Sequence, residues 1–110
     1  MVAANYNIIL EQKADFSRSF KIQMDNVDLD LTSYSFAAKL KERIQSDSGH
    51  DFTVTIADAA SGTITMTMTD EQTSAIKVGD YVYDLVMTDD AGLKSRLLQG
   101  MATVTGGVTG

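Results

Sequence analysis

One stretch of strand-forming residues, Gly79–Met87, constrains the fold more than any other part of the chain. Its two parities both contain apolar residues: Tyr81, Tyr83, Leu85 and Met87 alternate with Val82, Asp84 and Val86. A pleated strand directs alternate side chains to opposite faces of its sheet. We therefore predict a central strand that is covered on both faces for part of its length.

The segment before this strand, Thr69–Ile76, has the composition of one short helical turn with Thr69 as its N-cap. A helical turn, a Gly-x-Tyr sequence and a core strand in succession are typical of the corner before a late strand of an immunoglobulin-like β-sandwich. This order of segments predicts a sandwich with one short helix near residues 70–76.

Alternation of apolar and polar residues recurs along the rest of the chain, interrupted by segments rich in Gly, Asp and Asn. It predicts strands at residues 6–10, 16–24, 34–44, 52–56, 64–68, 79–87 and 93–105, separated by turns at 12–15, 58–62 and 88–92. Gly100 is expected to form a bulge in the last strand. The predicted fold is an all-β, immunoglobulin-like antiparallel β-sandwich of about 7–8 strands.

The length of 110 residues fits one domain, which we place at residues 1–110 with flexible ends at about 1–4 and 106–110. Two details allow other interpretations. Residues 36–45 are rich in helix formers, but the alternation from 34 to 44 favours a strand. Arg18 falls at the apolar parity of its strand, where we expect the side chain to reach solvent at the rim.

Composition limits the classes of function. The chain has no cysteine, which excludes a disulfide, a thiolate nucleophile and a cysteine metal site. Its net charge of -6 argues against nucleic acid and against an anionic membrane surface as partners, because both attract clustered Lys and Arg. The sequence predicts neither a signal peptide nor a transmembrane segment.

Three acidic or amide residues, Asn26, Asp28 and Asp30, have the spacing that begins a calcium-binding loop. Such a loop also needs a glycine and a glutamate, and here Leu31 and Ala37 stand at those positions. We therefore predict no metal site and expect these side chains to make local turn hydrogen bonds.

No catalytic constellation is recognisable. Residues 74–77 match the S-x-x-K spacing, but the further motifs of serine–lysine enzymes are absent. The single histidine, His50, lies in a Ser/Asp/Gly loop and is expected to be solvated. The acidic pairs Asp70-Glu71 and Asp89-Asp90 lie on turns, and Gly106-Gly107 precedes no helix. The sequence thus predicts no catalytic, cofactor-binding or metal-ligating residue and no cofactor.

Two other groups of residues have alternative interpretations. Lys39, Lys41 and Arg43 form a basic stripe on the outward parity of one strand, which we interpret as a solvated face or a rim contact with an acidic partner rather than a nucleic-acid site. Met66, Met68 and Met87 fall at core parities, so core packing is favoured over an adaptable binding surface.

Six segments spread over residues 5–105 share an ordered pattern. They are residues 9–16 (ILEQKADF), 29–34 (LDLTSY), 37–42 (AAKLKE), 61–69 (SGTITMTMT), 79–85 (GDYVYDL) and 96–105 (RLLQGMATVT). In order and spacing they resemble small virion proteins of tailed bacteriophages, in particular the immunoglobulin-like N-terminal domain of baseplate upper proteins. Lys13 and Ser33 stand where this family often has glycine, and the residues after Thr105 depart from its usual ending.

The resemblance implies a non-enzymatic structural component of the virion, in the tail, baseplate or fibre-attachment region. Its implied partners are other phage structural proteins, met as repeated copies in a symmetric assembly, with no nucleic acid and no membrane. Its implied location is the virion, after synthesis in the host cytoplasm. The N-terminal segment, the 45–51 loop and the C-terminal tail are the candidate contact segments, because short polar termini and loops can become ordered on assembly.

Two alternatives remain: a capsid decoration protein, and an adhesion or carbohydrate-binding β-sandwich. A carbohydrate site needs exposed aromatic rings, and only Tyr6 is loosely placed in the predicted pattern. The other aromatic residues fall at core parities: Phe16, Phe20, Tyr34, Phe36, Phe52, Tyr81 and Tyr83.

Overall fold

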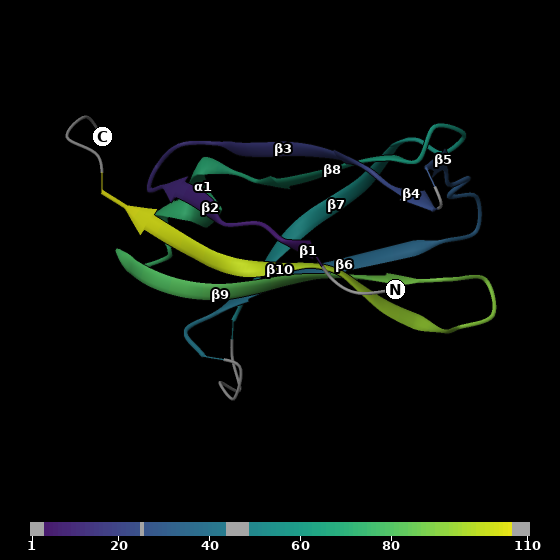
Figure 1. Ribbon diagram of the computed structural model, residues 1–110. Coiled ribbons are helices and arrows are strands. Elements are labelled where there is room, and N and C mark those ends of the chain that lie inside the picture. Colours follow the sequence, from purple (N-terminus) through teal and green to yellow (C-terminus); the bar gives the residue numbers. More distant parts are fainter. Residues whose placement is uncertain (1–3, 25, 44–48, 107–110) are drawn as a thin grey trace.

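The computed structural model describes residues 4–24, 26–43 and 49–106 (Figure 1). Its elements are β1 (Ala4–Asn5), β2 (Ile8–Glu11), β3 (Phe16–Lys21), β4 (Gln23–Met24), β5 (Val27–Asp28), β6 (Ser35–Lys41), β7 (His50–Asp58), β8 (Thr63–Met68), α1 (Asp70–Ser74), β9 (Gly79–Thr88) and β10 (Lys94–Thr105). The all-β class and the short helix are confirmed. Residues 36–41 of the segment for which a helix was the alternative belong to the strand β6.

Eight strands form one continuous sheet in the order β1-β10-β9-β6-β7-β8-β3, with β2 also paired to β10. β7 pairs with β6 through its first residues and with β8 through the rest. In Figure 1, β7 crosses from the lower layer, which holds β6, β9 and β10, to the upper layer with β3 and β8. The sheet is therefore curled and barrel-like, and it does not divide into the two separate sheets of an immunoglobulin sandwich.

The sheet is mixed, which differs from the predicted antiparallel arrangement. Both β1 and β2 run parallel to β10, while the other pairs of neighbouring strands are antiparallel. Alternation predicts which face a side chain occupies, but it contains no information on strand direction. The separate pair β4 and β5 forms a small antiparallel ribbon beside the main sheet.

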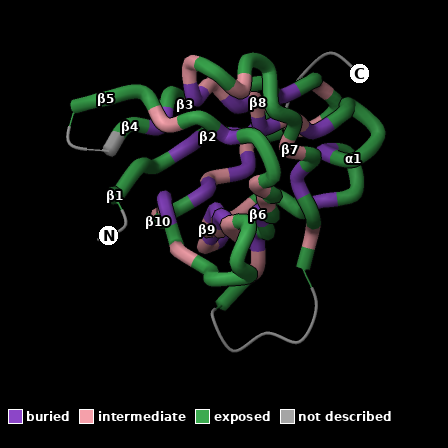
Figure 2. The backbone as a smooth tube through the Cα atoms, turned by 90° about the vertical axis from the view of Figure 1, so that its right-hand side faces the viewer, coloured by how far each residue is buried: buried purple, intermediate pink, exposed green. Residues whose placement is uncertain are grey.

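The core lies between the two layers of the curl, where the buried positions gather in Figure 2. The buried strand residues include Ile8, Leu10, Phe16, Ala38, Leu40, Phe52, Ile64, Met66, Met68, Tyr81, Tyr83, Leu85, Met87, Ala102 and Val104. Met66, Met68 and Met87 all belong to this set, which confirms the prediction that they pack in the core. Thr73 is the buried polar residue among the described ones, and Leu31 and Ile76 add apolar cover from the connections.

The strand β9 is central, as predicted, since it pairs with β6 on one side and β10 on the other. Its first parity, from Tyr81 to Met87, is buried. The opposite parity, Val82, Asp84 and Val86, is only half-buried, and no described element covers it. The second face of β9 is therefore an outer surface, not a second core.

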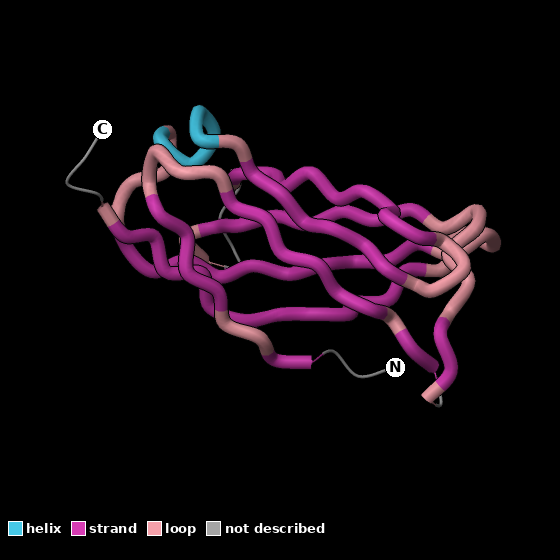
Figure 3. The backbone as a smooth tube through the Cα atoms, turned by 90° about the horizontal axis from the view of Figure 1, so that it is seen from above, coloured by secondary structure: helices cyan, strands magenta, loops and turns pink. Residues whose placement is uncertain are grey.

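The helix α1 lies at one end of the strands (Figure 3) and begins with a capping box. The Thr69 hydroxyl accepts a hydrogen bond from the Gln72 amide at 3.2 Å, and the Gln72 side chain accepts one from the Thr69 amide at 2.8 Å. These two bonds satisfy backbone donors that a helix start leaves unpaired. The buried Thr73 hydroxyl donates to the Ala14 carbonyl at 2.9 Å, which joins α1 to the turn after β2.

Three described non-glycine residues have the left-handed conformation that glycine favours, and one of them is Asn26, with φ of 65° between β4 and β5. Lys13 has φ of 64° in the turn before β3, and Ser33 has φ of 71° before β6. L-residues reach this region at a steric cost, because the side-chain Cβ approaches the backbone.

Gly100 does not form the bulge predicted for it. The irregularity of β10 lies between Arg96 and Leu98. A Cβ atom on Gly100 would lie 2.5 Å from the Tyr6 carbonyl oxygen and 2.9 Å from Asn7 Oδ1. Gly100 therefore allows the N-terminal segment to approach β10 closely where that segment breaks into β1 and β2.

The predicted flexible ends lie largely outside the described residues, and Ala4 already belongs to β1. His50, predicted in a solvated loop, is the first residue of β7 and is half-buried. Arg18 is exposed as expected, with its guanidinium 5.7 Å from the centre of the Phe16 ring. Among the described residues, no helix is long and apolar enough to cross a membrane.

Candidate functional site

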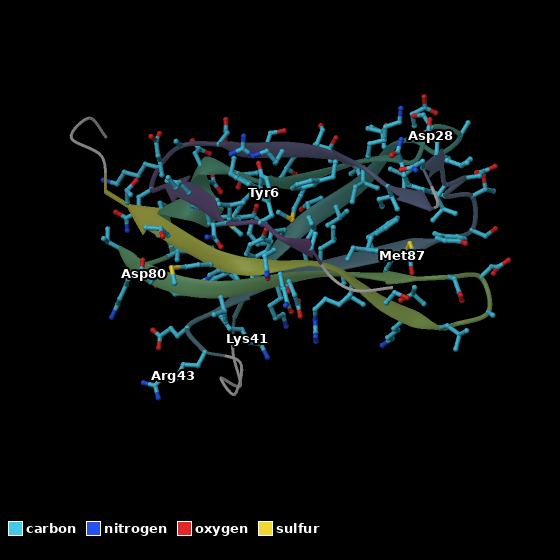
Figure 4. The ribbon with its side chains drawn as sticks, viewed as in Figure 1. Tyr6, Asp28, Lys41, Arg43, Asp80 and Met87 are labelled. Carbon is cyan, nitrogen blue, oxygen red and sulfur yellow. The ribbon has the colours of Figure 1, made fainter. Side chains whose placement is uncertain are left out.

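A groove of about 650 Å³ lies on the outer face of the sheet, over β6, β9, β10 and β1. Its lining residues are Asn5, Asn7, Lys39, Lys41, Val82, Tyr83, Asp84, Arg96, Gln99, Gly100 and Met101. In Figure 4, Lys41 lies below the ribbon of β9, on the side away from the core. We call this surface the outer groove.

One row across the outer groove combines a cation with apolar side chains. Val82 in β9 is the direct register partner of Lys41 in β6 and of Met101 in β10. Register partners direct their side chains to the same face of a sheet. Lys41 and Val82 are half-buried and Met101 is 47% exposed, so this row presents an ammonium group beside two aliphatic side chains.

The neighbouring row is polar, and its charges are paired. The Lys39 ammonium lies 3.6 Å from the Asp51 carboxylate, and Arg96 Nε donates to Asp84 at 3.1 Å. Within the described part of the chain, Lys41 makes no such ion pair. The outer groove thus contains one uncompensated cation, Lys41, next to its apolar surface.

Side-chain amides form the other end of the outer groove. Asn7 Oδ1 accepts a hydrogen bond from the Met101 amide at 2.9 Å, in place of a strand carbonyl. Gln99 and Asn5 are register partners in β10 and β1, with a side-chain separation of 3.5 Å. This end is held close to β10 because the Tyr6 amide donates to the Gln99 carbonyl at 2.9 Å.

Tyr83 contributes no aromatic surface to the outer groove, although it lies in the lining. It is 3% exposed, and its ring packs in the core against Phe52 at 6.3 Å between centroids. Its hydroxyl donates to the Tyr6 carbonyl, and burial, followed by the nearby Tyr6, raises the pKa of Tyr83 to about 12. The Tyr6 ring itself packs edge-on against Phe20 at 5.4 Å.

The outer groove offers recognition chemistry. An ammonium group, side-chain amides and aliphatic surface can hold a polar chain, whereas acid–base catalysis requires a titratable pair in hydrogen-bond reach of a substrate. The described residues contain no group of three His, Cys, Asp or Glu side chains that could hold a metal ion.

The residues with calcium-loop spacing make local contacts. Asp28 lies 3.2 Å from the Lys21 ammonium and accepts from Gln23 at 3.0 Å, and the Gln23 hydrogen bond is the first cause that lowers the pKa of Asp28. Asp30 accepts from the hydroxyl and the amide of Thr32, which lower its pKa. The Asp30 contacts are the predicted turn hydrogen bonds, whereas Asp28 makes its contacts across the β4–β5 ribbon, where Gln23 is its register partner.

The other sequence candidates also have local roles. The Ser74 hydroxyl donates to the Glu71 carbonyl at 2.7 Å within α1. Asp70 accepts from the Glu71 amide, and Asp89 accepts from the amides of Ala91 and Leu93. The contacts of these side chains cap a helix and close a turn.

The basic stripe is the sequence prediction that leads to the outer groove. Lys39 and Lys41 line it, whereas Arg43 lies beyond the end of β6. Sequence reasoning missed Val82, Met101 and the three amides. The parity of Val82 placed it on the outer face, and this was the signal available in the sequence. Its neighbours on that face, Lys41 and Met101, lie on strands distant in the sequence, so the groove itself could not be predicted.

A second, smaller cavity of about 310 Å³ lies where the curled sheet stays open, between β1 and β10 on one side and β3 and β4 on the other. It is lined mainly by apolar residues, namely Ala4, Phe20, Ile22, Leu85, Leu97 and Leu98, with Lys21 and Gln23. Since β3 is the last strand of the sheet, it pairs only with β8 in the described structure.

No protein-family model matches the chain, and no curated protein matches it. Among solved structures, the chain is similar to an internalin-like protein of Listeria monocytogenes, with 12% sequence identity and a TM-score of 0.45. That likeness covers 96% of this chain and 28% of the internalin-like protein. Likeness at this level identifies neither a family nor a function.

Proposed function

We propose that this chain is a non-enzymatic structural module of a bacteriophage virion, located in the tail, baseplate or fibre-attachment region, that binds other phage proteins. The observation that carries the binding role is the outer groove, in which the unpaired Lys41 adjoins the aliphatic Val82 and Met101. Such a surface suits a protein segment, and its described residues offer no acid–base pair.

The phage setting rests on the resemblance of six ordered sequence segments. The backbone at two turns agrees with that resemblance. Lys13 and Ser33 stand where the family often has glycine, and both adopt the left-handed conformation in which glycine is favoured. Glycine at these two positions of the family is what such a left-handed backbone favours.

A free sheet edge supports a role in assembly. The strand β3 ends the sheet, so one row of its backbone N–H and C=O groups faces no described strand. An unpaired edge can add a strand from a neighbouring protein. The outer groove and this edge lie on different elements, so one copy could contact two neighbours.

The decisive experiment is the localisation of the chain in purified particles of the phage that encodes it. Quantitative mass spectrometry should find it in stoichiometric proportion to tail proteins, and electron microscopy with a fused tag should place it at the tail or baseplate. Placement on the head would favour the decoration role. Particles that lack the chain would contradict any virion role.

A truncation tests the C-terminal tail as a contact segment. Deletion of residues 106–110 should leave the free energy of unfolding nearly unchanged, because β10 ends at Thr105. It should lower the amount of chain incorporated into particles. Equal incorporation of the truncated and complete chains would exclude a role for the tail in docking.

A further inference from the structure

We propose that the outer groove binds an extended segment of a partner protein in which a carboxylate side chain lies close to an aliphatic side chain. The carboxylate pairs with Lys41, and the aliphatic side chain packs on Val82 and Met101. This inference rests on the protein-binding role proposed above and specifies the chemistry of the partner.

The charge of the outer groove favours an acidic ligand. Three cationic side chains and one carboxylate line it, although the whole chain has a net charge of -6. Lys39 and Arg96 are already paired with acids. Lys41 lacks an ion pair among the described residues, so its ammonium is available to a ligand carboxylate.

The apolar half of the ligand follows from register. Lys41, Val82 and Met101 lie side by side on three adjacent strands, so the row spans two strand spacings, about 10 Å. About three residues of an extended chain cover that distance. A carboxylate and an aliphatic side chain one or two residues apart can therefore contact both ends of the row.

The amide end distinguishes a peptide from other polar chains. Asn5, Asn7 and Gln99 can donate to and accept from a peptide backbone. Asn7 uses only its oxygen in the described structure, to accept from the Met101 amide, and its NH₂ group has no described partner.

Two other ligand classes fit the outer groove less well. Sugar rings and nucleobases both stack on exposed aromatic rings, and the single aromatic in the lining, Tyr83, has its ring in the core. A nucleic-acid backbone also requires several uncompensated cations, while Lys41 alone is uncompensated in the described groove.

The test uses a fluorescein-labelled peptide, Thr-Glu-Leu-Thr-Glu-Leu-Thr-Ser, and a matched peptide with Gln in place of Glu. Binding to the complete chain is measured by fluorescence anisotropy at low and high salt. The Glu peptide should bind more tightly than the Gln peptide, and high salt should weaken it. In NMR spectra of the chain, the amide signals of Lys41, Val82 and Met101 should shift.

Lys41→Gln should weaken binding of the Glu peptide by about two- to fivefold, the range expected for an ion pair at a protein surface. The matched control is Lys77→Gln, which removes the same charge from an exposed position outside the groove and should bind like the unchanged chain. Met101→Ser should weaken both peptides, because it removes shared apolar contact. Melting temperatures confirm that each variant is folded.

The inference is overturned by equal binding of the two peptides, by equal loss in the Lys41 and Lys77 variants, by signal shifts confined to residues outside the groove, or by no peptide binding. Tighter binding of single-stranded oligothymidylate or of polygalacturonate than of the Glu peptide also overturns it. So does self-association of the chain that Lys41→Gln abolishes, since the occupant is then a second copy.

The failure of this inference differs from the failure of the proposed function. If particles contain the chain at the tail but the peptides do not bind, the virion role stands and the acidic partner is excluded. If the Glu peptide binds through Lys41 but particles lack the chain, the binding chemistry stands and the virion role is excluded.

Discussion

Tyr83 is the residue on which the N-terminal end of the outer groove depends. Its hydroxyl satisfies the Tyr6 carbonyl at the break between β1 and β2, from a ring that is otherwise buried in the core. A buried polar group that loses its partner costs about 1–3 kcal/mol. The position of Asn7 in the groove thus depends on a hydrogen bond that originates in the core.

Tyr83→Phe should lower the free energy of unfolding at neutral pH by about 1–3 kcal/mol, because the Tyr6 carbonyl loses its donor. Urea unfolding followed by circular dichroism measures this change. Tyr34→Phe is the matched control, since Tyr34 is half-buried and its hydroxyl has no described hydrogen bond. Equal losses in the two variants would contradict the role assigned to the Tyr83 hydroxyl.

The raised pKa of Tyr83 also predicts that the free energy of unfolding decreases at alkaline pH. Burial raises the pKa of Tyr83 from 10.0 to about 12, so between these pH values the unfolded chain has lost the proton that the folded chain retains. The unfolded state then binds fewer protons, and stability falls as pH rises. In the Tyr83→Phe variant the free energy of unfolding should decrease less steeply as pH rises. Part of the decrease should remain, because burial also raises the pKa of Tyr81.

We predict that glycine in place of Lys13 or of Ser33 stabilises the protein. Each has a positive φ that costs an L-residue about 1–2 kcal/mol and glycine very little. The greater freedom of glycine in the unfolded chain offsets about 0.5–1 kcal/mol. Lys13→Gly and Ser33→Gly should therefore each raise the free energy of unfolding by up to about 1 kcal/mol.

Thermal and urea unfolding measure this gain. Lys94→Gly is the control, because this exposed lysine lies in β10 with ordinary strand geometry and glycine should destabilise a strand. Loss of stability in the Lys13 and Ser33 variants equal to that in the control would show that the left-handed conformations cost the native residues nothing.

At the scale of elements, α1 depends on its cap because it is only five residues long. So short a helix has little stability of its own. Thr69→Ala removes the hydroxyl of the capping box and should lower the free energy of unfolding by about 0.5–2 kcal/mol. Chemical denaturation measures the change.

Thr69→Ser is the informative control, because serine retains the capping hydroxyl and should preserve most of the stability. Hydrogen exchange localises the effect, which should increase opening of the Thr73 amide, a donor to the Thr69 carbonyl in the first turn. If the alanine and serine variants lose equal stability, the methyl group of Thr69 and not its hydroxyl supports the helix.

The elements that sequence reasoning predicted best are those with local signals. The alternation of β8 and β9 and the cap of α1 involve neighbours in the sequence, and the structure confirms them. The parallel pairing of β1 and β2 with β10 was missed because it joins residues more than 90 positions apart. Gly100 was misread for the same reason, since its steric neighbour is Tyr6.

The outer groove shows the same limit. The parity of β6 predicted that Lys39 and Lys41 face outward together, and both line the groove. Their apolar neighbour Met101 could not be assigned, because it reaches Lys41 only through the register of β6, β9 and β10. A pattern within one strand predicts a face, but the order of strands decides which residues share it.

On the scale of the whole molecule, the curl of one sheet separates surfaces of different chemistry. The outer face of β7, β8 and β3 presents threonine and serine hydroxyls, such as Thr65 beside Ser19 at 3.1 Å. The outer face of β6, β9 and β10 holds the cationic groove. A strongly acidic chain can therefore present a local positive surface to a partner that its average charge would repel.

The parallel pairing of β1 and β2 with β10 has a mechanical consequence. The arrowheads of β2 and β10 point the same way in Figure 1, and β1 also runs parallel to β10. Tension applied to residues 4 and 105 acts along these strands, so it loads their hydrogen bonds together in shear. Tension applied across the β9–β10 turn would instead break such bonds one after another. A molecule stretched between its ends should consequently rupture abruptly and at the higher force.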